Sequence, residues 1–197
     1  MSTRSSLAAH AIGLFLLLVA GRISAEIPPD LPFTPGSEER WVLVDTDTYT
    51  ITVYQGEAPF VRLENLAVGR AGTAETRRRG DQTTPTGKFR IDRIHPESNY
   101  HFFLGLNYPT MEHARDARDD GTIERDEYEH FLDEFANQGR APQNTALGGH
   151  IGIHGVGDRS VSFHRGVNWT DGCVAVEDEQ IDILAELVDI GTRVYIR

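Results

Sequence analysis

Cysteine is almost absent from this chain of 197 residues, because Cys173 is the only one. A single cysteine cannot form a disulfide within the chain, so the fold must depend on a hydrophobic core rather than on cross-links. A lone thiol is buried and inert, bonded to another molecule, or reactive. The residues around Cys173 must decide between these three possibilities.

Long apolar runs are also scarce. The longest, residues 11–20 (AIGLFLLLVA), has ten residues, whereas a bilayer-spanning helix needs about 20. Arg4 precedes this run and Ile23-Ser24-Ala25 follows it, which is the order of a signal peptide. We therefore expect residues 1–25 to be a signal peptide and the protein to be periplasmic or at the cell surface. The alternative is an uncleaved segment that anchors the chain to the membrane.

Basic residues are few. The chain has 19 Lys and Arg against 30 Asp and Glu, a net charge of −11. Residues 1–25 hold Arg4 and Arg22 and no acids, so their removal would leave a net charge of −13. This charge repels phosphates and argues against nucleic acid as a partner.

Short apolar segments, many of them β-branched and alternating with polar residues, dominate the rest of the chain. We expect residues 26–40, rich in Pro and acids, to be a linker and residues 41–197 to form one α+β domain, predominantly β-sheet. A C-terminal helix is expected at 177–189 and a final strand at 193–197. The other strands are expected at 41–44, 50–54, 60–68, 88–91, 102–106, 148–155 and 173–176, with loops at 70–87 and 156–171.

Residues 111–136 have a different character, with ten acids and three arginines. Apolar residues recur there at helical spacing, which predicts a helical insert in the sheet domain, and we expect this insert to cap the active cleft. Residues 116–127 nearly fit a calcium-binding EF-hand loop. Arg118, however, puts a cation where a ligand oxygen belongs, so we predict no micromolar calcium affinity and no metal site.

The residues around Cys173 favour a reactive thiol. A thiol attacks a carbonyl as thiolate, which needs a nearby base. His154 lies on a Gly-rich segment 19 residues upstream and is the candidate general base and acid. Gly172 permits a sharp turn whose N–H groups would hold an oxyanion. The sequence thus predicts Cys173 as nucleophile, His154 as base and Gly172 in an oxyanion turn.

The wider pattern resembles a known family. Residues 151–155 (IGIHG) and 170–174 (TDGCV) resemble the signature of the L,D-transpeptidase catalytic domain (YkuD-like), and residues 84–89 (TPTGKF) resemble its Thr-Pro-x-Gly-x-Phe/Tyr turn. The resemblance covers about residues 40–197. Asp171 replaces a His of the commonest signature and Ala175 an Arg, a form similar to murein amidase-like members.

The resemblance implies an L,D-transpeptidase-like mixed β-sheet domain that acts on peptidoglycan stem peptides without a cofactor. Cys173 would form a thioester with the stem peptide and pass the acyl group to an amine. The residues expected to contact substrate are Gly155, Asn168, Trp169, Thr170 and Asp171.

Several alternatives stay open at this stage. One alternative has water as the acyl acceptor, which would make the protein an L,D-carboxypeptidase or murein–protein amidase. Two others are a silent wall-binding module and a sortase-like enzyme with Arg193 in its site. His150 and His164 compete with His154 as base. Arg77, Arg78 and Arg79 either attract substrate carboxylates or form a solvated loop, and we favour the solvated loop.

Overall fold

The computed structural model describes residues 27–197. The expected signal peptide therefore falls almost entirely outside the described residues and stays a prediction, as does the boundary of the linker at residue 26. No described helix has both the length and the hydropathy that a membrane crossing requires.

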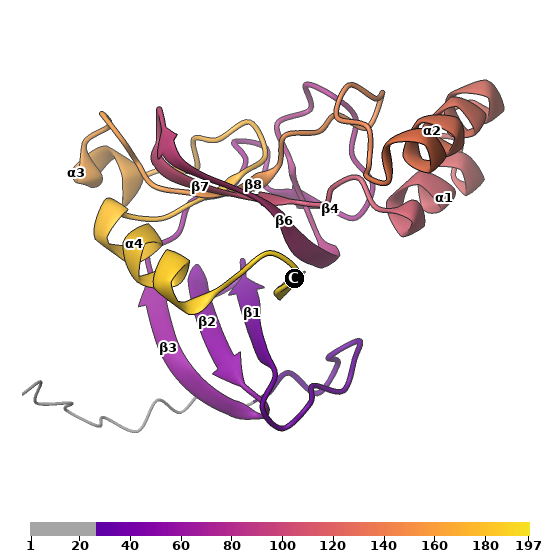
Figure 1. Ribbon diagram of the computed structural model, residues 1–197. Helices are drawn as coiled ribbons and strands as arrows, with labels where there is room; N and C mark the ends of the chain where they lie inside the picture. Colours follow the sequence, from indigo (N-terminus) through magenta and orange to yellow (C-terminus); the bar gives the residue numbers. More distant parts are fainter. Residues whose placement is uncertain (1–26) are drawn as a thin grey trace, which may run out of the picture.

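Eight strands form one mixed sheet in the order β3-β2-β1-β10-β6-β7-β8-β9 (Figure 1). Within residues 27–197, four helices accompany it: α1 (Met111–Asp119), α2 (Arg125–Gln138), α3 (Val161–His164) and α4 (Asp178–Leu187). The predicted α+β fold dominated by sheet is confirmed. The strands of the main sheet are β1 (Arg40–Asp45), β2 (Thr50–Gln55), β3 (Ala58–Glu64), β6 (Gly87–Ser98), β7 (His101–Leu106), β8 (Gly152–His154), β9 (Val174–Ala175) and β10 (Arg193–Ile196); β4 (Thr73–Ala74) and β5 (Thr84–Pro85) pair separately.

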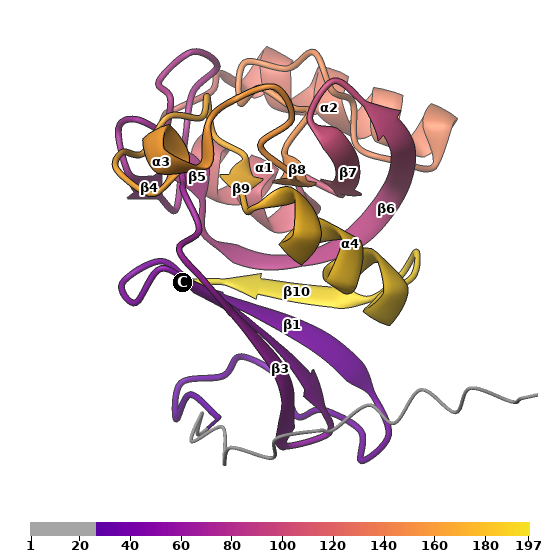
Figure 2. The ribbon, with the colours of Figure 1, turned by 90° about the vertical axis from the view of Figure 1, so that its left-hand side faces the viewer.

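The long strand β6 joins two halves of this sheet. Its first residues pair with β10, and its later residues pair with β7. Register shifts between Ile91 and Arg93 mark the change of partner, and such irregularities bend a strand. The halves consequently diverge, with β1, β2 and β3 on one side and β7, β8 and β9 on the other (Figure 2).

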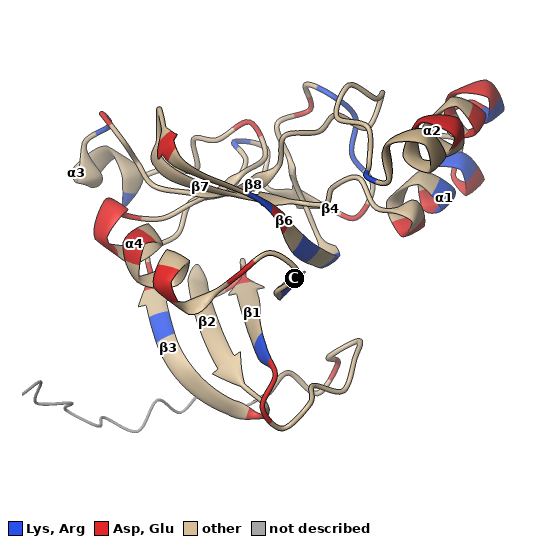
Figure 3. Cartoon of the chain, in the orientation of Figure 1, with Lys and Arg blue, Asp and Glu red and all other residues tan. Residues whose placement is uncertain are grey.

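Helix α4 fills the angle between the halves (Figures 1 and 2). Ile181 and Leu184 are fully buried, consistent with their helical spacing. Glu177 and Gln180 form a capping box at its start. Acids occupy its first turn, where their negative charge interacts favourably with the positive end of the helix dipole. The acids of α4, and those of α1 and α2, are visible in Figure 3.

Two expected strands are shorter than predicted. The segment expected at 60–68 leaves the strand after Glu64, because Asn65 has a φ of 63°. Residues 67 and 69 instead pair with Ala175 and Thr170. The strand expected at 148–155 begins only at Gly152, because Gly148 and His150 have positive φ. Helix α3, within the expected 156–171 loop, was not predicted.

The insert is two antiparallel helices, α1 and α2, and the predicted helical region is confirmed. Gly121 separates them with a φ of 76°. The guanidinium of Arg118 donates to Asp119 and lies 4.5 Å from the centre of the Tyr128 ring. No cluster of three potential metal ligands occurs in residues 27–197. The expectation of no calcium binding stays a prediction that only a binding measurement can test.

Candidate active site

Strand register brings the predicted nucleophile and base together. Strands β8 and β9 are parallel, with Ile153 opposite Val174 and His154 opposite Ala175. Ile153 and Val174 are fully buried in the core. Side chains alternate along a strand, so His154 lies on the other face, and Cys173, one residue before Val174, lies on that face too. The pair therefore occupies one face of two adjacent strands.

His154 is held in one tautomer. Its Nδ1 is 2.6 Å from the Gly155 carbonyl oxygen. A carbonyl only accepts hydrogen bonds, so Nδ1 carries the proton and Nε2 keeps a lone pair. Burial lowers the pKa of His154 to about 4, although the bond to Gly155 acts in the opposite direction. The imidazole is neutral at pH 7, and Nε2 is free to accept a proton.

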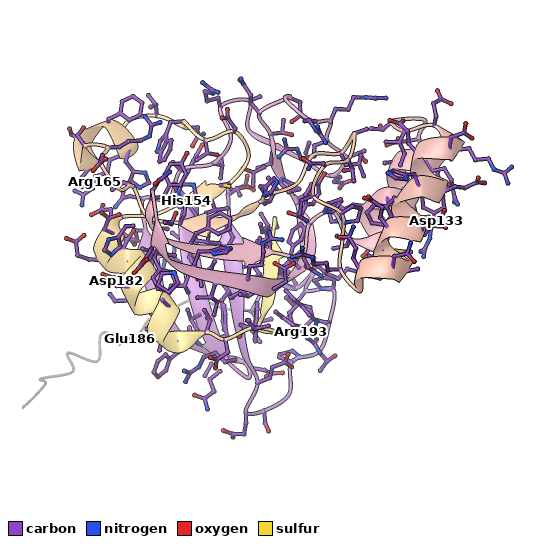
Figure 4. The ribbon with its side chains drawn as sticks, turned by 45° about the horizontal axis from the view of Figure 1, so that its top comes forward. Asp133, His154, Arg165, Asp182, Glu186 and Arg193 are labelled. Atoms are coloured by element: carbon purple, nitrogen blue, oxygen red, sulfur yellow. The ribbon has the colours of Figure 1, made fainter. Side chains whose placement is uncertain are left out.

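Aromatic rings enclose this imidazole. Tyr100 stacks on it with ring centres 4.3 Å apart, and Trp169 meets it edge-on at 5.7 Å. Figure 4 shows His154 well away from Asp133 of α2. Although α2 is remote from His154, Gly121 between the two helices accepts from Arg78, and capping of the cleft by the insert stays a prediction. Its buried residues, such as Phe131, pack into the core.

The thiol of Cys173 is neutral at rest. Its Sγ donates to the His150 carbonyl oxygen at 3.4 Å. Burial raises the pKa of the thiol to about 11, while the Gly152 backbone and the charge of Arg77 act in the opposite direction. No hydrogen bond within residues 27–197 joins this thiol to His154. In this conformation the thiol proton is directed to His150 rather than to His154.

The raised thiol pKa predicts a pH profile for alkylation. Only the thiolate reacts, so below about pH 11 the reactive fraction of Cys173 is small. The rate of modification by iodoacetamide should rise roughly tenfold per pH unit between about pH 7 and 10, following the thiolate fraction. Mass spectrometry of timed samples measures this rate. A plateau below pH 9 would contradict the expectation.

The turn before Cys173 is closely braced. Gly172 has a φ of 132°, and its N–H donates to the Thr170 hydroxyl at 3.1 Å. The same hydroxyl donates to the Cys173 carbonyl oxygen at 2.6 Å. The Gly172 N–H is thus in use. The Cys173 N–H has no partner in the described part of the chain, which makes it the better-placed donor for an oxyanion.

The residues predicted to contact substrate have different surroundings. Asn168 accepts from the Val68 N–H and donates to the Tyr49 hydroxyl, and both bonds hold chain segments together. Gly155 is packed so closely that a Cβ there would lie 2.3 Å from Asp178. Asp171 is exposed, pairs with Arg70 and lines a cavity. Thr170 braces the turn and Trp169 covers His154, as described above. Their contact with substrate stays a prediction.

The competing histidines have other surroundings. The indole N–H of Trp169 donates to His164 Nδ1 at 3.2 Å, so His164 supports the ring that covers His154. His150 contributes its backbone carbonyl to the thiol, as noted. One residue close to the pair was missed by sequence reasoning: Tyr100, in the turn between β6 and β7, which carries no motif and reaches His154 only through folding. Arg77, expected to lie in a solvated loop, is buried and packs against Gly172 instead.

Comparison with known proteins identifies a family and solved structures of similar fold. The L,D-transpeptidase catalytic domain (YkuD) family matches residues 39–196. Two solved structures are similar in fold: Bd1075 from Bdellovibrio bacteriovorus, at 19% identity and a TM-score of 0.51, and the K307A mutant of the helical cell shape determining protein Pgp2 from Campylobacter jejuni, also at 19% and 0.51.

These similarities cover most of this chain but only part of the two proteins compared. The alignments cover 81% and 82% of this chain but only 48% of the Bd1075 and Pgp2 chains. A search of curated proteins found no match. The family match spans most of the chain, including both Cys173 and His154. The chain belongs to the L,D-transpeptidase catalytic domain family.

Proposed function

We propose that this protein is an exported cysteine acyltransferase that acts on peptidoglycan stem peptides. The observation that carries the proposal is the placement of Cys173 and His154 on one face of adjacent strands, with His154 Nε2 left as the proton acceptor. Membership of the family supports the substrate class. Export is proposed from the signal-like residues 1–25.

The proposed reaction has two halves. In the first, the Cys173 thiol rotates toward His154, gives its proton to Nε2 and attacks the carbonyl carbon before the terminal D-alanine. The Cys173 N–H stabilises the oxyanion. The C–N bond then breaks, and the leaving amine takes the proton from the imidazolium. The product is a thioester between Cys173 and the stem peptide.

In the second half an acceptor replaces sulfur. An amine of another stem peptide loses a proton to His154 Nε2 and attacks the thioester carbonyl. The C–S bond breaks, and the sulfur takes the proton back, which restores the neutral thiol. Because the resting pair is a neutral thiol and a neutral imidazole, a stable thiolate–imidazolium pair is not part of this cycle.

Intact-protein mass spectrometry tests the first half directly. Incubation with a muropeptide that carries a tetrapeptide stem should add the mass of the donor less D-alanine, and a carbapenem should add its own mass. Cys173→Ala should show neither adduct. A folded wild-type protein without any adduct, or an equal adduct on the variant, would refute the proposal. A thiol closed to alkylation in a protein that still sediments with murein would favour a wall-binding module.

The acceptor distinguishes transfer from hydrolysis. Asp171 and Ala175 depart from the commonest signature, and Ala175 is fully buried between β8 and residue 67. No side-chain charge therefore occupies that position. Product analysis with and without an added amine acceptor decides the matter. An exchanged or cross-linked product supports transfer, whereas D-alanine release alone, unaffected by the amine, supports an L,D-carboxypeptidase.

A further inference from the structure

Arg77 is a buried cation whose hydrogen-bond donors are largely unused. Its side chain is only 4% exposed. Nη2 lies 3.4 Å from Asp81 Oδ1 and 3.5 Å from the Asp171 carbonyl oxygen. Nε and Nη1, both buried, have no partner within residues 27–197. Buried donors without acceptors are costly, so their retention points to a ligand that supplies an acceptor.

Asp81 compensates this charge only in part. Its Oδ2 accepts from the Arg78 N–H at 2.7 Å, and its Oδ1 accepts from the Thr83 N–H at 3.0 Å. The carboxylate is therefore shared between Arg77 and two backbone donors that shape the loop. The contact with Arg77 is long for a charge-assisted hydrogen bond, which is usually about 2.7–2.9 Å. Arg77 keeps the capacity to bind a second anion.

The Nη1 side of the Arg77 guanidinium faces the turn at Gly172, directly before Cys173. A Cβ built on Gly172 would lie 2.2 Å from Nη1, so the guanidinium rests directly against Gly172, the neighbour of Cys173. Arg77 also lines a cavity of about 430 Å³, together with Arg79, His150 and Asp171, among others. His150 is the residue whose carbonyl accepts the Cys173 thiol. The cavity and the thiol thus share His150 as a neighbour.

The charges around this cavity favour an anion. Arg77 and Arg79 contribute cations from the loop between β4 and β5. Asp171 is the one acid in its lining, and that carboxylate is engaged by Arg70. Arg79 is fixed by its Nε, which donates to the Thr145 carbonyl oxygen at 2.9 Å, and this leaves its remaining donors available. The site thus combines arginine side chains that are held in place with an excess of positive charge.

We propose that Arg77 binds the carboxylate of the acyl donor's last residue. It thereby selects peptides in which a single residue follows the bond to be cleaved. This assignment of substrate rests on the proposed function, whereas the affinity of the site for a carboxylate does not. From the sequence we expect a solvated loop for Arg77, Arg78 and Arg79 together. Burial separates Arg77 from Arg78, which is exposed and donates to the Gly121 carbonyl oxygen.

Alkylation with two small reagents tests the carboxylate site without peptidoglycan. Iodoacetate carries a carboxylate and iodoacetamide does not, and the ratio of their rates cancels changes in thiol pKa. The ratio of the iodoacetate rate to the iodoacetamide rate at Cys173, normalised to free cysteine, should fall about tenfold or more in Arg77→Met. This is the size expected for loss of a charge-assisted contact. The ratio should stay unchanged in the matched variant Arg78→Met. An unchanged ratio in a folded Arg77→Met protein would overturn the proposal.

A second test uses the substrate and covers the case in which Arg77→Met does not fold. The wild-type protein should be acylated by a tetrapeptide-stem muropeptide at least tenfold faster than by the same compound with a C-terminal amide. Arg77→Lys, which keeps the charge, should retain part of this preference. Equal rates for acid and amide would refute the role of Arg77 alone. Absence of acylation by both, with the iodoacetate preference intact, would refute the proposed function alone.

Discussion

Replacement of His154 by asparagine is expected to slow formation of the Cys173 thioester by two to four orders of magnitude, the usual contribution of a general base. The asparagine amide can still donate to the Gly155 carbonyl in place of Nδ1. It offers no base in place of Nε2. The change therefore removes proton transfer while it preserves the local hydrogen bond. Rapid-quench sampling with intact-mass detection measures the acylation rate.

His130→Asn is the matched control, because His130 is an exposed residue of α2. It should acylate at the wild-type rate. Alkylation of Cys173 at pH 10, where solvent hydroxide removes the thiol proton, should change little in His154→Asn. An acylation rate within threefold of wild type would show that another group serves as base, and His164 or His150 would then need the same test.

Replacement of Gly172 by alanine is expected to destabilise the fold by roughly 3 kcal/mol and to abolish acylation. The residue has a φ of 132°, which side chains rarely adopt. The new Cβ would also lie 2.2 Å from Arg77 Nη1 and 2.7 Å from the Thr83 carbonyl oxygen. Either the turn or the arginine loop must move. The midpoint of urea unfolding and the adduct yield measure the two effects.

Gly191→Ala separates backbone strain from the clash. Gly191 also has a positive φ, of 94°, but a Cβ there meets nothing within 4 Å. This variant should lose only about 1 kcal/mol, the cost of the backbone conformation, and should acylate normally. If the two variants lost equal stability, the close packing of Gly172 against Arg77 would not be energetically important.

Local sequence was sufficient to predict, in outline, the pair Cys173 and His154 and the segments that carry them. Cys173 and His154 lie in short segments whose composition predicts strands and turns, and the structure places both segments side by side. The C-terminal helix was equally predictable, because Ile181 and Leu184 follow helical spacing. Predicted strand ends were wrong at Asn65 and His150, since positive φ values depend on neighbours that the sequence does not display.

The sequence by itself determined a family, a sheet-rich domain and a lone thiol with a histidine upstream, because these depend on residue types and short spacings. Tertiary structure alone decided the state of that thiol. Burial keeps it neutral against the opposing charge of Arg77, and its Sγ donates to the His150 carbonyl oxygen. It also separated one buried arginine from its exposed neighbour. Desolvation and long-range packing set both properties, and neither is encoded in any local pattern.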